Sequence, residues 1–214
     1  MDAFSSYTVR AAYDEVAADY VAAFGDDLAR LPLDRAMLDA ALDALPAGLP
    51  AMDLGCGPGA VASYLSARGA HVIGVDLSGR MLGLAHASEP ALRLVQGDMR
   101  RLPFPSGAYG LIVAYYCIQH VPRSSVVAVL EEINRVLSAH GALLIATHLG
   151  EGDVYTSDFL GHQIDAMGGA LYHVDDLVRH LQTCGLVIEV AKQREPLAHE
   201  YDTQRVYVLA RKGT

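Results

Sequence analysis

A glycine-rich loop near residue 53 is the first segment whose residue types and spacing could do chemistry. Residues 53–59 read Asp-Leu-Gly-Cys-Gly-Pro-Gly and follow a short apolar run. Glycines let backbone amides approach a ligand closely, and the start of a following helix favours an anionic group. A pyrophosphate and an amino-acid carboxylate both meet that description, and the spacing Gly55-x-Gly57-x-x-Ala60 also satisfies a dinucleotide-binding pattern. The loop alone therefore does not identify the ligand. The alternative is that it is only a tight strand-to-helix turn that binds no ligand.

Two further acids follow apolar runs farther along the chain. Asp76 ends the second run, where a carboxylate can accept hydrogen bonds from both ribose hydroxyls of an adenosine. Asp98 and Met99 follow the third run, where they can meet the amine and the ring of an adenine. Because parallel strands end at one sheet edge, Asp53, Asp76 and Asp98 are expected to share one crevice. The alternatives are that Asp76 caps a helix and that Asp98 is a loop acid.

Three histidines are candidates for moving a proton, because imidazole titrates near neutral pH. His120 follows the fourth apolar run, His148 ends the fifth, and His162 lies in a glycine-containing insertion that could cover a pocket. Each has a structural alternative: His120 could cap a helix or pack, and His162 could be a solvent-exposed loop residue.

The apolar pattern predicts the elements that would position these residues. Helices are expected at 9–24 and 33–45, ahead of the main alternation. Strands at 51–54, 71–75, 92–95, 109–115 and 142–147 alternate with helices at 60–68, 78–86 and 124–137. This alternation predicts a parallel sheet with helices on both faces. A helix at 175–184 and strands at 186–190 and 205–210 follow, the two strands forming an antiparallel pair at the sheet edge, while 151–169 is expected to be irregular.

Composition narrows the class of protein. The chain has 214 residues, 52% of them hydrophobic, and a formal charge of −9, which fits a globular protein without an electrostatic footprint for nucleic acid. No secretory leader or membrane-spanning run is evident. Three scattered cysteines indicate a reducing cytoplasm and argue against a disulfide framework or a zinc site. The expected partner is a small molecule, not nucleic acid or membrane, with the chain a monomer or homodimer.

Four segments together resemble the class I S-adenosylmethionine-dependent methyltransferases, in a small bacterial subgroup. They are Met-Asp-Leu-Gly-Cys-Gly-Pro-Gly at 52–59, Gly-Val-Asp-Leu-Ser at 74–78, Gly-Asp-Met with Leu-Pro-Phe at 97–104, and Arg-Val-Leu with Gly-Ala-Leu-Leu-Ile at 135–145. The resemblance implies a Rossmann-like α/β three-layer sandwich with a seven-stranded, mostly parallel sheet, its last strand antiparallel, and an N-terminal helical cap. One methyltransferase domain is expected over 1–214, with the cap at 1–48, the cofactor-binding core at 50–148, and a lid-like insertion and closing strands at 149–214.

The resemblance also implies roles for individual residues. Asp53 and Gly55 to Gly57 would line the methionine end of the cofactor, Asp76 the ribose, and Asp98 with Met99 the adenine. Tyr13 lies where related enzymes carry a tyrosine on a cap that closes over the cofactor. The expected cofactor contacts are Tyr13, Asp53, Gly55, Cys56, Gly57, Asp76, Leu77, Met81, Asp98, Met99 and Tyr115. The bulky pair Tyr115-Tyr116 departs from the small or polar residue that is usual after the fourth strand.

The expected reaction is methyl transfer to a small molecule, by O- or N-methylation, with His120, His148 and His162 as candidate catalytic residues. No metal is expected; Glu151, Asp153 and Asp158 are the only acidic cluster that keeps a weak metal option open. Two alternatives remain. One is an NAD-dependent oxidoreductase, although the chain lacks a Tyr-x-x-x-Lys constellation and its only lysines are Lys192 and Lys212. The other is a repurposed domain that binds the cofactor without transferring the methyl group.

Overall fold

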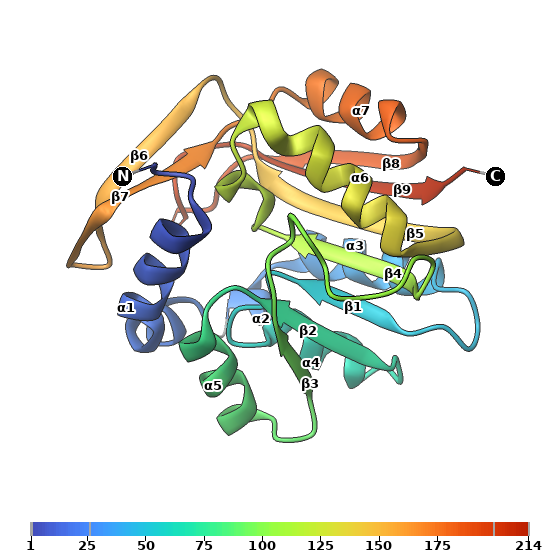
Figure 1. Cartoon of the computed structure of the whole chain (residues 1–214), viewed down its shortest axis with the longest axis horizontal. Coiled ribbons are helices and arrows are strands. Elements are labelled where there is room, and N and C mark those ends of the chain that lie inside the picture. The colour runs from blue at the N-terminus through green and yellow to red at the C-terminus, as the bar shows by residue number, and fades with distance from the viewer. Residues whose placement is uncertain (1, 26, 199, 214) are drawn as a thin grey trace.

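Seven strands form one twisted sheet in the computed structural model, which describes residues 2–25, 27–198 and 200–213 (Figure 1). Their order across the sheet is β3-β2-β1-β4-β5-β9-β8. The strands are β1 (Ala51–Leu54), β2 (Val72–Asp76), β3 (Arg93–Gln96), β4 (Tyr109–Tyr115), β5 (Leu137–His148), β8 (Leu186–Arg194) and β9 (Arg205–Lys212). Strands β1 to β5 run parallel, and β9 is antiparallel to both of its neighbours, β5 and β8. The predicted sheet, with its last strand antiparallel, is confirmed.

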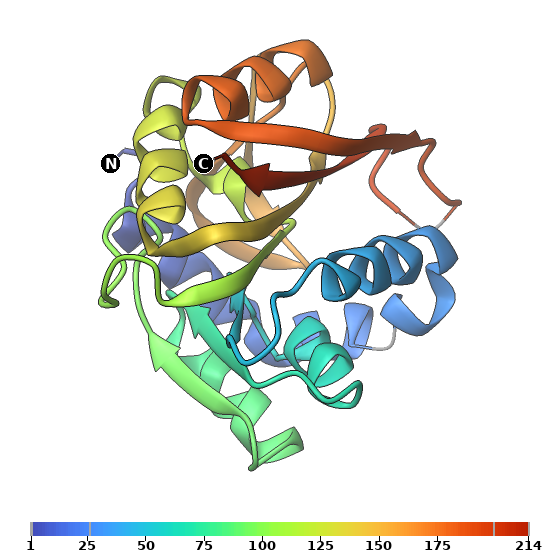
Figure 2. The same ribbon diagram turned by 90° about the vertical axis from the view of Figure 1, so that its right-hand side faces the viewer.

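Helices cover both faces of this sheet, as Figure 2 shows from the side. They are α1 (Ser6–Phe24), α2 (Asp27–Arg30), α3 (Pro32–Asp43), α4 (Ala60–Ser66), α5 (Gly79–Ser88), α6 (Val126–Val136) and α7 (Val174–Thr183), with 3-10 turns η1 (Ile118–His120) and η2 (Arg123–Ser125). Alternate residues of β4 serve the two faces: Ile112 packs in the cluster that contains α6, and Leu111 in the cluster that contains α3. The result is the expected three-layer sandwich.

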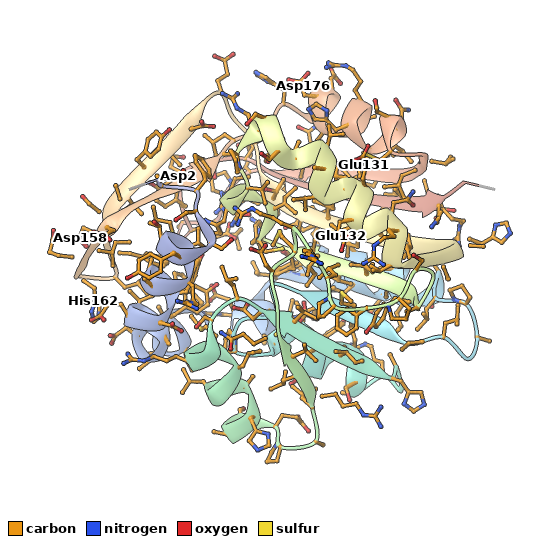
Figure 3. The ribbon with its side chains drawn as sticks, in the orientation of Figure 1. Asp2, Glu131, Glu132, Asp158, His162 and Asp176 are labelled. Carbon is orange, nitrogen blue, oxygen red and sulfur yellow. The ribbon has the colours of Figure 1, made fainter. Side chains whose placement is uncertain are left out.

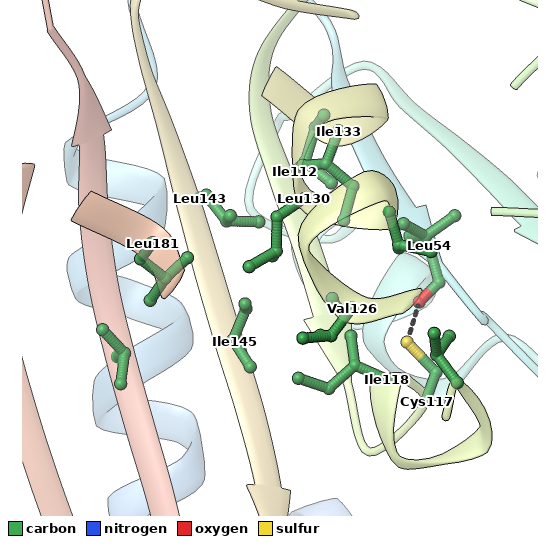
Figure 4. Packing of buried hydrophobic residues seen from close by; sticks show 14 of the residues in the cluster. Leu54, Ile112, Cys117, Ile118, Val126, Leu130, Ile133, Leu143, Ile145 and Leu181 are labelled. Carbon is green, nitrogen blue, oxygen red and sulfur yellow. Dashed lines mark hydrogen bonds between the residues drawn. The ribbon is translucent and has the colours of Figure 1, made fainter. Parts of the chain in front are cut away.

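The core beneath α6 and α7 is fully closed to solvent. Ile112 of β4 and Leu143 and Ile145 of β5 are 0% exposed and belong to the cluster that holds Leu130 of α6 and Leu181 of α7 (Figure 4). Burying such aliphatic side chains stabilises the fold by roughly 1.5–3 kcal/mol each, relative to leaving them in water. This packing fixes the strand ends from which the functional side chains project.

Of the two long helices predicted as an N-terminal cap, α1 lies at the carboxyl edge of the sheet, whereas α3 packs on one face of the sheet against β4, β5 and β9, which corrects its assignment to the cap. Helix α1 begins at Ser6, ahead of the predicted Val9, because the Ser5 hydroxyl accepts a hydrogen bond from Thr8 N at 3.1 Å and caps the helix. Helix α1 packs beside α5 and beside β7 (His162–Ala170), a strand outside the seven-stranded sheet. Helix α1 is therefore held at two places.

The segment at 151–169 is not irregular, so that prediction is wrong. It forms a separate two-stranded antiparallel hairpin of β6 (Asp153–Phe159) and β7 (His162–Ala170), which lies beside α1 (Figure 1). Leu160 and Gly161 make the turn with positive φ values of 53° and 82°, the geometry of a tight hairpin. The sequence carries no Asn-Gly or Asp-Gly signal there, so the turn could not be predicted from it.

None of the helices within the described residues combines the length and apolar character that crossing a membrane requires.

Candidate functional site

A cavity of about 740 Å³ lies at the carboxyl ends of the central strands. Helix α1, the β6–β7 hairpin and the connection between β8 and β9 form its outer walls. Of the predicted site residues, the cavity is lined by Tyr13, Asp53, Gly55, Cys56, Gly57, Asp76, Leu77, Met81, Asp98, Met99, Tyr115, His120 and His148. The structure therefore brings together all eleven expected cofactor contacts and two of the three histidines.

The glycine loop leaves β1 in a conformation that requires glycine. Gly55 has φ +71°, and a Cβ atom placed there would lie 2.3 Å from the Cβ of Cys117. Cys117 is itself fixed, because its thiol donates to Leu54 O at 3.1 Å (Figure 4). The Gly57 amide donates to Asp76 Oδ2 at 2.7 Å, while a Cβ at Gly57 would meet no atom within 4 Å. The loop thus lies close against the protein on one side and leaves open space on the other.

Asp53 carries an acceptor that the described chain does not satisfy. The residue is 1% exposed; its Oδ2 accepts from Ala62 N at 2.8 Å, and its Oδ1 has no hydrogen-bond partner within the described residues. Burial raises the pKa of this carboxyl to about 7, with the Ala62 bond opposing and the nearby Asp76 adding to the shift. A buried carboxylate oxygen without a donor is suited to a ligand that brings an ammonium group.

Asp76 and Asp98 sit at the ends of β2 and β3 and already have protein partners. Asp76 Oδ1 accepts from Ser78 N at 2.8 Å, and burial raises the pKa of Asp76. Asp98 accepts from Arg100 N at 2.9 Å and from the hydroxyl of Ser6 at the start of α1. Each carboxylate has more lone pairs than these bonds use, so both can also accept from a ligand.

Leu77 and Met81 belong to the junction that docks α1. Ser78 caps α5 by accepting from Met81 N at 3.0 Å, as predicted, and its hydroxyl donates to Asp14 Oδ1 of α1 at 2.6 Å. Asp14 was not predicted as a site residue, because nothing in the sequence pairs it with a serine 64 positions away.

Tyr13 and His120 form a hydrogen-bonded pair across the cavity. Tyr13 Oη lies 2.8 Å from His120 Nε2, and His120 Nδ1 lies 3.1 Å from Gly168 O of β7. Since a carbonyl can only accept, Nδ1 carries the proton and Nε2 accepts from Tyr13. Burial lowers the pKa of His120 to about 4, against a smaller raising effect of the Gly168 bond, so its imidazole is neutral at pH 7.

His148 ends β5 on the far side of the cavity from Asp76. Its Nδ1 lies 2.7 Å from the hydroxyl of Thr203, which also accepts from Arg205 Nη1 at 3.0 Å. Burial first, and then the charge of Arg205, lower the pKa of His148 to about 4. Both cavity histidines are thus neutral and only weakly basic.

His162 does not line the cavity. It is the first residue of β7, next to the hairpin turn (Figure 3). Its Nε2 lies 2.8 Å from Asp19 Oδ2, and its Nδ1 lies 3.4 Å from Glu15 Oε1. These acids of α1 raise the pKa of His162, the Asp19 bond most strongly. The side chain ties the hairpin to α1, so its expected place at the reacting centre is corrected.

Tyr115 lines the cavity, but its hydroxyl points into a buried polar network that the sequence did not reveal. Asp34, 1% exposed, accepts from Tyr115 Oη at 2.5 Å and from Tyr207 Oη at 2.7 Å. Tyr116 Oη lies 2.9 Å from Tyr207 Oη, and Arg194 Nε donates to Tyr207 Oη at 2.8 Å. These residues come from four separate elements, so no local pattern joins them.

The connection between β8 and β9 was also missed as a wall of the cavity. Glu200, Tyr201, Thr203 and Arg205 line it. Arg205 is 3% exposed, and its Nη1 donates to Tyr201 O at 2.6 Å. A charged residue at the start of an apolar strand was the one available signal, because such a charge must find partners when it is buried.

The acidic cluster of the insertion is dispersed. Asp153 pairs with Arg123 at 3.3 Å, Glu151 with His173 at 3.4 Å, and Asp158 accepts from Gly161 N at 3.2 Å. Within the described ranges, no group of three or more His, Cys, Asp or Glu side chains is placed to hold a metal ion.

Known methyltransferases resemble this chain in sequence. A family model described as a methyltransferase domain matches residues 51–141. The chain is 33% identical over 142 residues to a demethylmenaquinone methyltransferase of Beutenbergia cavernae, covering 65% of this chain and 58% of the relative. It is 38% identical over 101 residues to a malonyl-[acyl-carrier protein] O-methyltransferase of Legionella pneumophila, covering 45% of this chain and 35% of the relative. The chain thus matches only part of the length of these curated relatives.

Solved structures share the fold over nearly the whole chain. The magnesium protoporphyrin IX methyltransferase of Synechocystis, solved with bound S-adenosylmethionine, superimposes with a TM-score of 0.71 at 17% identity, covering 97% of each chain. That likeness concerns the fold, while the motifs and the family model concern the sequence. Residues 51–141 thus match a methyltransferase domain in sequence, and the chain shares the fold of solved S-adenosylmethionine-dependent methyltransferases.

Proposed function

We propose that this protein transfers the methyl group of S-adenosylmethionine to a small-molecule acceptor, by O- or N-methylation. One observation carries the proposal: a single cavity holds the three acids of β1 to β3 at one end and neutral tyrosine and histidine side chains beyond β4 and β5 at the other. A cofactor and an acceptor would lie side by side in such a cavity.

The chain's own residues fit the cofactor. The unpaired Asp53 Oδ1 would accept a hydrogen bond from the amino group of the cofactor. The open face of the Gly57 turn leaves room for the methionine end of the cofactor. Asp76 would bind the ribose, and Asp98 with Met99 the adenine. We propose Leu77, Met81, Cys56 and Tyr115 as further walls of this half, since all line the cavity.

When bound, the cofactor supplies a methyl group on a sulfonium centre, which is already a good leaving group. The protein's task is then alignment and exclusion of water, which can contribute several powers of ten in rate. Helix α1 and the hairpin provide the cover: the Phe159 ring lies 5.6 Å from the Tyr13 ring, and the Gly168 amide donates to Ala3 O at 2.9 Å.

We assign His120 a positioning role. The lowered pKa of His120 makes it a weak general base. Its tautomer is fixed, so Nε2 accepts the hydrogen bond from the Tyr13 hydroxyl and the lone pairs of Tyr13 stay available for a ligand. His148 is proposed to contact the acceptor, since it lines the cavity at the end of β5.

The reaction is tested by incubating the folded protein with S-adenosylmethionine and a panel of alcohols, phenols and amines, and measuring S-adenosylhomocysteine by mass spectrometry. We expect release that depends on one class of acceptor. Binding of the cofactor without release for any acceptor would contradict methyl transfer and favour a repurposed domain.

Two substitutions separate positioning from base catalysis at His120. His120→Gln keeps a side-chain oxygen that can accept from Tyr13, whereas His120→Leu does not. We expect His120→Gln to retain most of the kcat and His120→Leu to lose it by about tenfold or more, the lower range for a misplaced catalytic group. An equal loss in both variants would instead identify His120 as the base.

Composition and the cavity support a proposal for the location and the partner of the protein. We propose a cytoplasmic protein, because Cys56, Cys117 and Cys184 are buried free thiols. We further propose a small molecule as the partner, because the acceptor half of the cavity is walled by α1 and the β8–β9 connection.

A further inference from the structure

The half of the cavity beyond β4, β5 and β9 has a definite hydrogen-bonding polarity. We call it the acceptor chamber and define it by Tyr13, Tyr116, Gln119, His148 and Arg205, all of which line the cavity. Each of the first three carries an oxygen, and the direction of its hydrogen bonds follows from the neighbouring groups.

Tyr116 donates its proton to the protein. Tyr207 gives its own proton to Asp34, because a carboxylate can only accept, so the Tyr207 oxygen must accept from Arg194 and from Tyr116. Tyr116 Oη therefore keeps lone pairs for a ligand. The backbone of Tyr116 is held at φ +49°, a rare conformation for a bulky residue. The Tyr116 amide helps to fix it by donating a hydrogen bond to Ala146 O at 2.8 Å.

Tyr13 and Gln119 have the same polarity. The tautomer of His120 makes Tyr13 a donor to Nε2, so Tyr13 Oη also keeps its lone pairs. Gln119 Nε2 donates to Tyr116 O at 2.6 Å, and Gln119 Oε1 is buried without a hydrogen-bond partner among the described residues. A ligand that fills the chamber must therefore present a donor.

The charges of the cavity disfavour an anionic acceptor. Six carboxylates line it: Asp27, Asp53, Asp76, Asp98, Asp158 and Glu200. Its arginines are Arg10, Arg100 and Arg205. Arg100 donates to Phe4 O and to Asp98, and Arg10 is exposed over the ring of Tyr7. Asp53, Asp76 and Asp98 lie at the cofactor end, so a free carboxylate in the chamber would meet the charge of Glu200 and no donor among the three oxygens of the chamber.

Arg205 is the place where an anion would compete. It lies 3.8 Å from Glu200, and its Nε is buried without a hydrogen-bond partner within the described residues. A neutral hydroxyl meets this donor equally well, because its oxygen can accept one bond while its proton is donated to Tyr116 or Gln119. An ammonium group is disfavoured there, because it would lie near the positive charge of the bound cofactor.

Rings form the sides of the chamber. The Tyr116 ring lies 5.2 Å from that of His148 and 4.6 Å from that of Tyr115, and the Tyr13 ring lies 5.2 Å from that of His120. Such walls favour a flat, apolar body that stacks or packs edge-on.

We propose that the methyl acceptor is an uncharged aromatic alcohol, bound with its hydroxyl donating to the oxygens of Tyr13, Tyr116 or Gln119. The assignment rests on the proposed methyl transfer and narrows it to O-methylation of a phenol-like group. In this step the O–CH3 bond would form as the S–CH3 bond of the cofactor breaks, S-adenosylhomocysteine would leave, and the hydroxyl proton would be released to water.

Four probes on one two-ring frame test the assignment by calorimetry. They are 2-naphthol, 2-methoxynaphthalene, 2-naphthoate and 2-naphthylmethylammonium, each titrated into protein loaded with sinefungin, an analogue that keeps a positive charge near the sulfonium position. We expect 2-naphthol to bind at least about tenfold more tightly than each of the others. Equal or tighter binding of another probe, or no binding of 2-naphthol to loaded protein, overturns the assignment. Failure of sinefungin itself to bind would instead contradict the proposed function.

A substitution locates the recognition. Gln119→Leu removes the unpaired oxygen, so the preference for 2-naphthol over 2-methoxynaphthalene should shrink by about threefold or more, while sinefungin affinity stays the same. Gln193→Leu, at an exposed position of β8 outside the cavity, should leave the preference unchanged. A preference that survives Gln119→Leu, Tyr116→Phe and Tyr13→Phe would overturn the chamber as its source.

Discussion

Gly55 shows how one residue can be required by a neighbour far away in the sequence. Its positive φ favours glycine, and the Cys117 side chain occupies the space that a Cβ would need. We expect Gly55→Ala to lower the free energy of unfolding by about 2–4 kcal/mol, since strain and overpacking add. Urea unfolding measures it, with Gly48→Ala as the control, because Gly48 has φ +80° but no atom within 4 Å of the added Cβ. Equal losses would mean that Cys117 does not constrain the loop.

His120 makes stability depend on pH in a predictable direction. Its pKa is about 4 in the folded protein and 6.5 as the reference, so the unfolded chain binds more protons between these values and stability falls as the pH drops from 6.5 to 4. Asp53 acts in the opposite direction, because its pKa is raised. The comparison with His120→Gln isolates the contribution of the histidine. Between pH 7 and 4.5, the free energy of unfolding should fall by about 2 kcal/mol less in His120→Gln than in the unsubstituted protein. Parallel curves for the two proteins would show that His120 titrates normally.

At the residue scale, the sequence predicted which side chains lie together where local spacing decides it. Asp53, Gly55 and Asp76 line one cavity because each ends or follows an apolar run. Asp34 was not found, because its partners Tyr115 and Tyr207 are far along the chain. His162 was misplaced for the same reason, since its position depends on acids in α1.

Helix α3 is tied to the sheet by the same Asp34. Removing its carboxylate leaves the buried hydroxyls of Tyr115 and Tyr207 without this acceptor. It also takes away one of the two carboxylates beside Arg194, at 3.4 Å, and leaves Glu200 at 2.5 Å as the other. We expect Asp34→Ala to cost about 3 kcal/mol in unfolding free energy, as breaking a buried ionic network does. Asp39→Ala is the matched control on α3, because Asp39 is half exposed and pairs with Arg68 at 2.9 Å; its cost should stay below about 1 kcal/mol. Similar costs would refute a structural role for the buried network.

At the element scale, the strands were predicted where burial alone decides them. Strands β1 and β4 begin and end at the predicted residues, because both are apolar runs buried on two faces. The β6–β7 hairpin escaped prediction because β6 is mostly exposed and the buried residues of β7 are confined to its end, so neither an apolar run nor a regular alternation marks it. Its turn, moreover, uses a leucine at positive φ.

For the whole molecule, the strand order arranges the chemistry. Because β3, β2 and β1 lie on one side of β4 and β5, the three acids gather at one end of the cavity and Tyr116, His148 and Arg205 at the other. Through its resemblance to a family, the sequence predicted a seven-stranded, mostly parallel sheet with its last strand antiparallel, but not the order of the strands. The far wall depends on how the β8–β9 connection folds back, which no local pattern encodes.

The central claim is that the acid-lined half of the cavity binds S-adenosylmethionine. Isothermal titration of the folded protein with S-adenosylmethionine, S-adenosylhomocysteine and NAD tests it most directly. The variant is Asp76→Asn, and the control is Asp165→Asn, at an exposed position of β7 outside the cavity. We predict that both adenosyl ligands bind, that NAD does not, and that Asp76→Asn weakens binding by about tenfold or more while Asp165→Asn changes it little. Binding of NAD alone, or of none of the three ligands to folded protein, would contradict the claim.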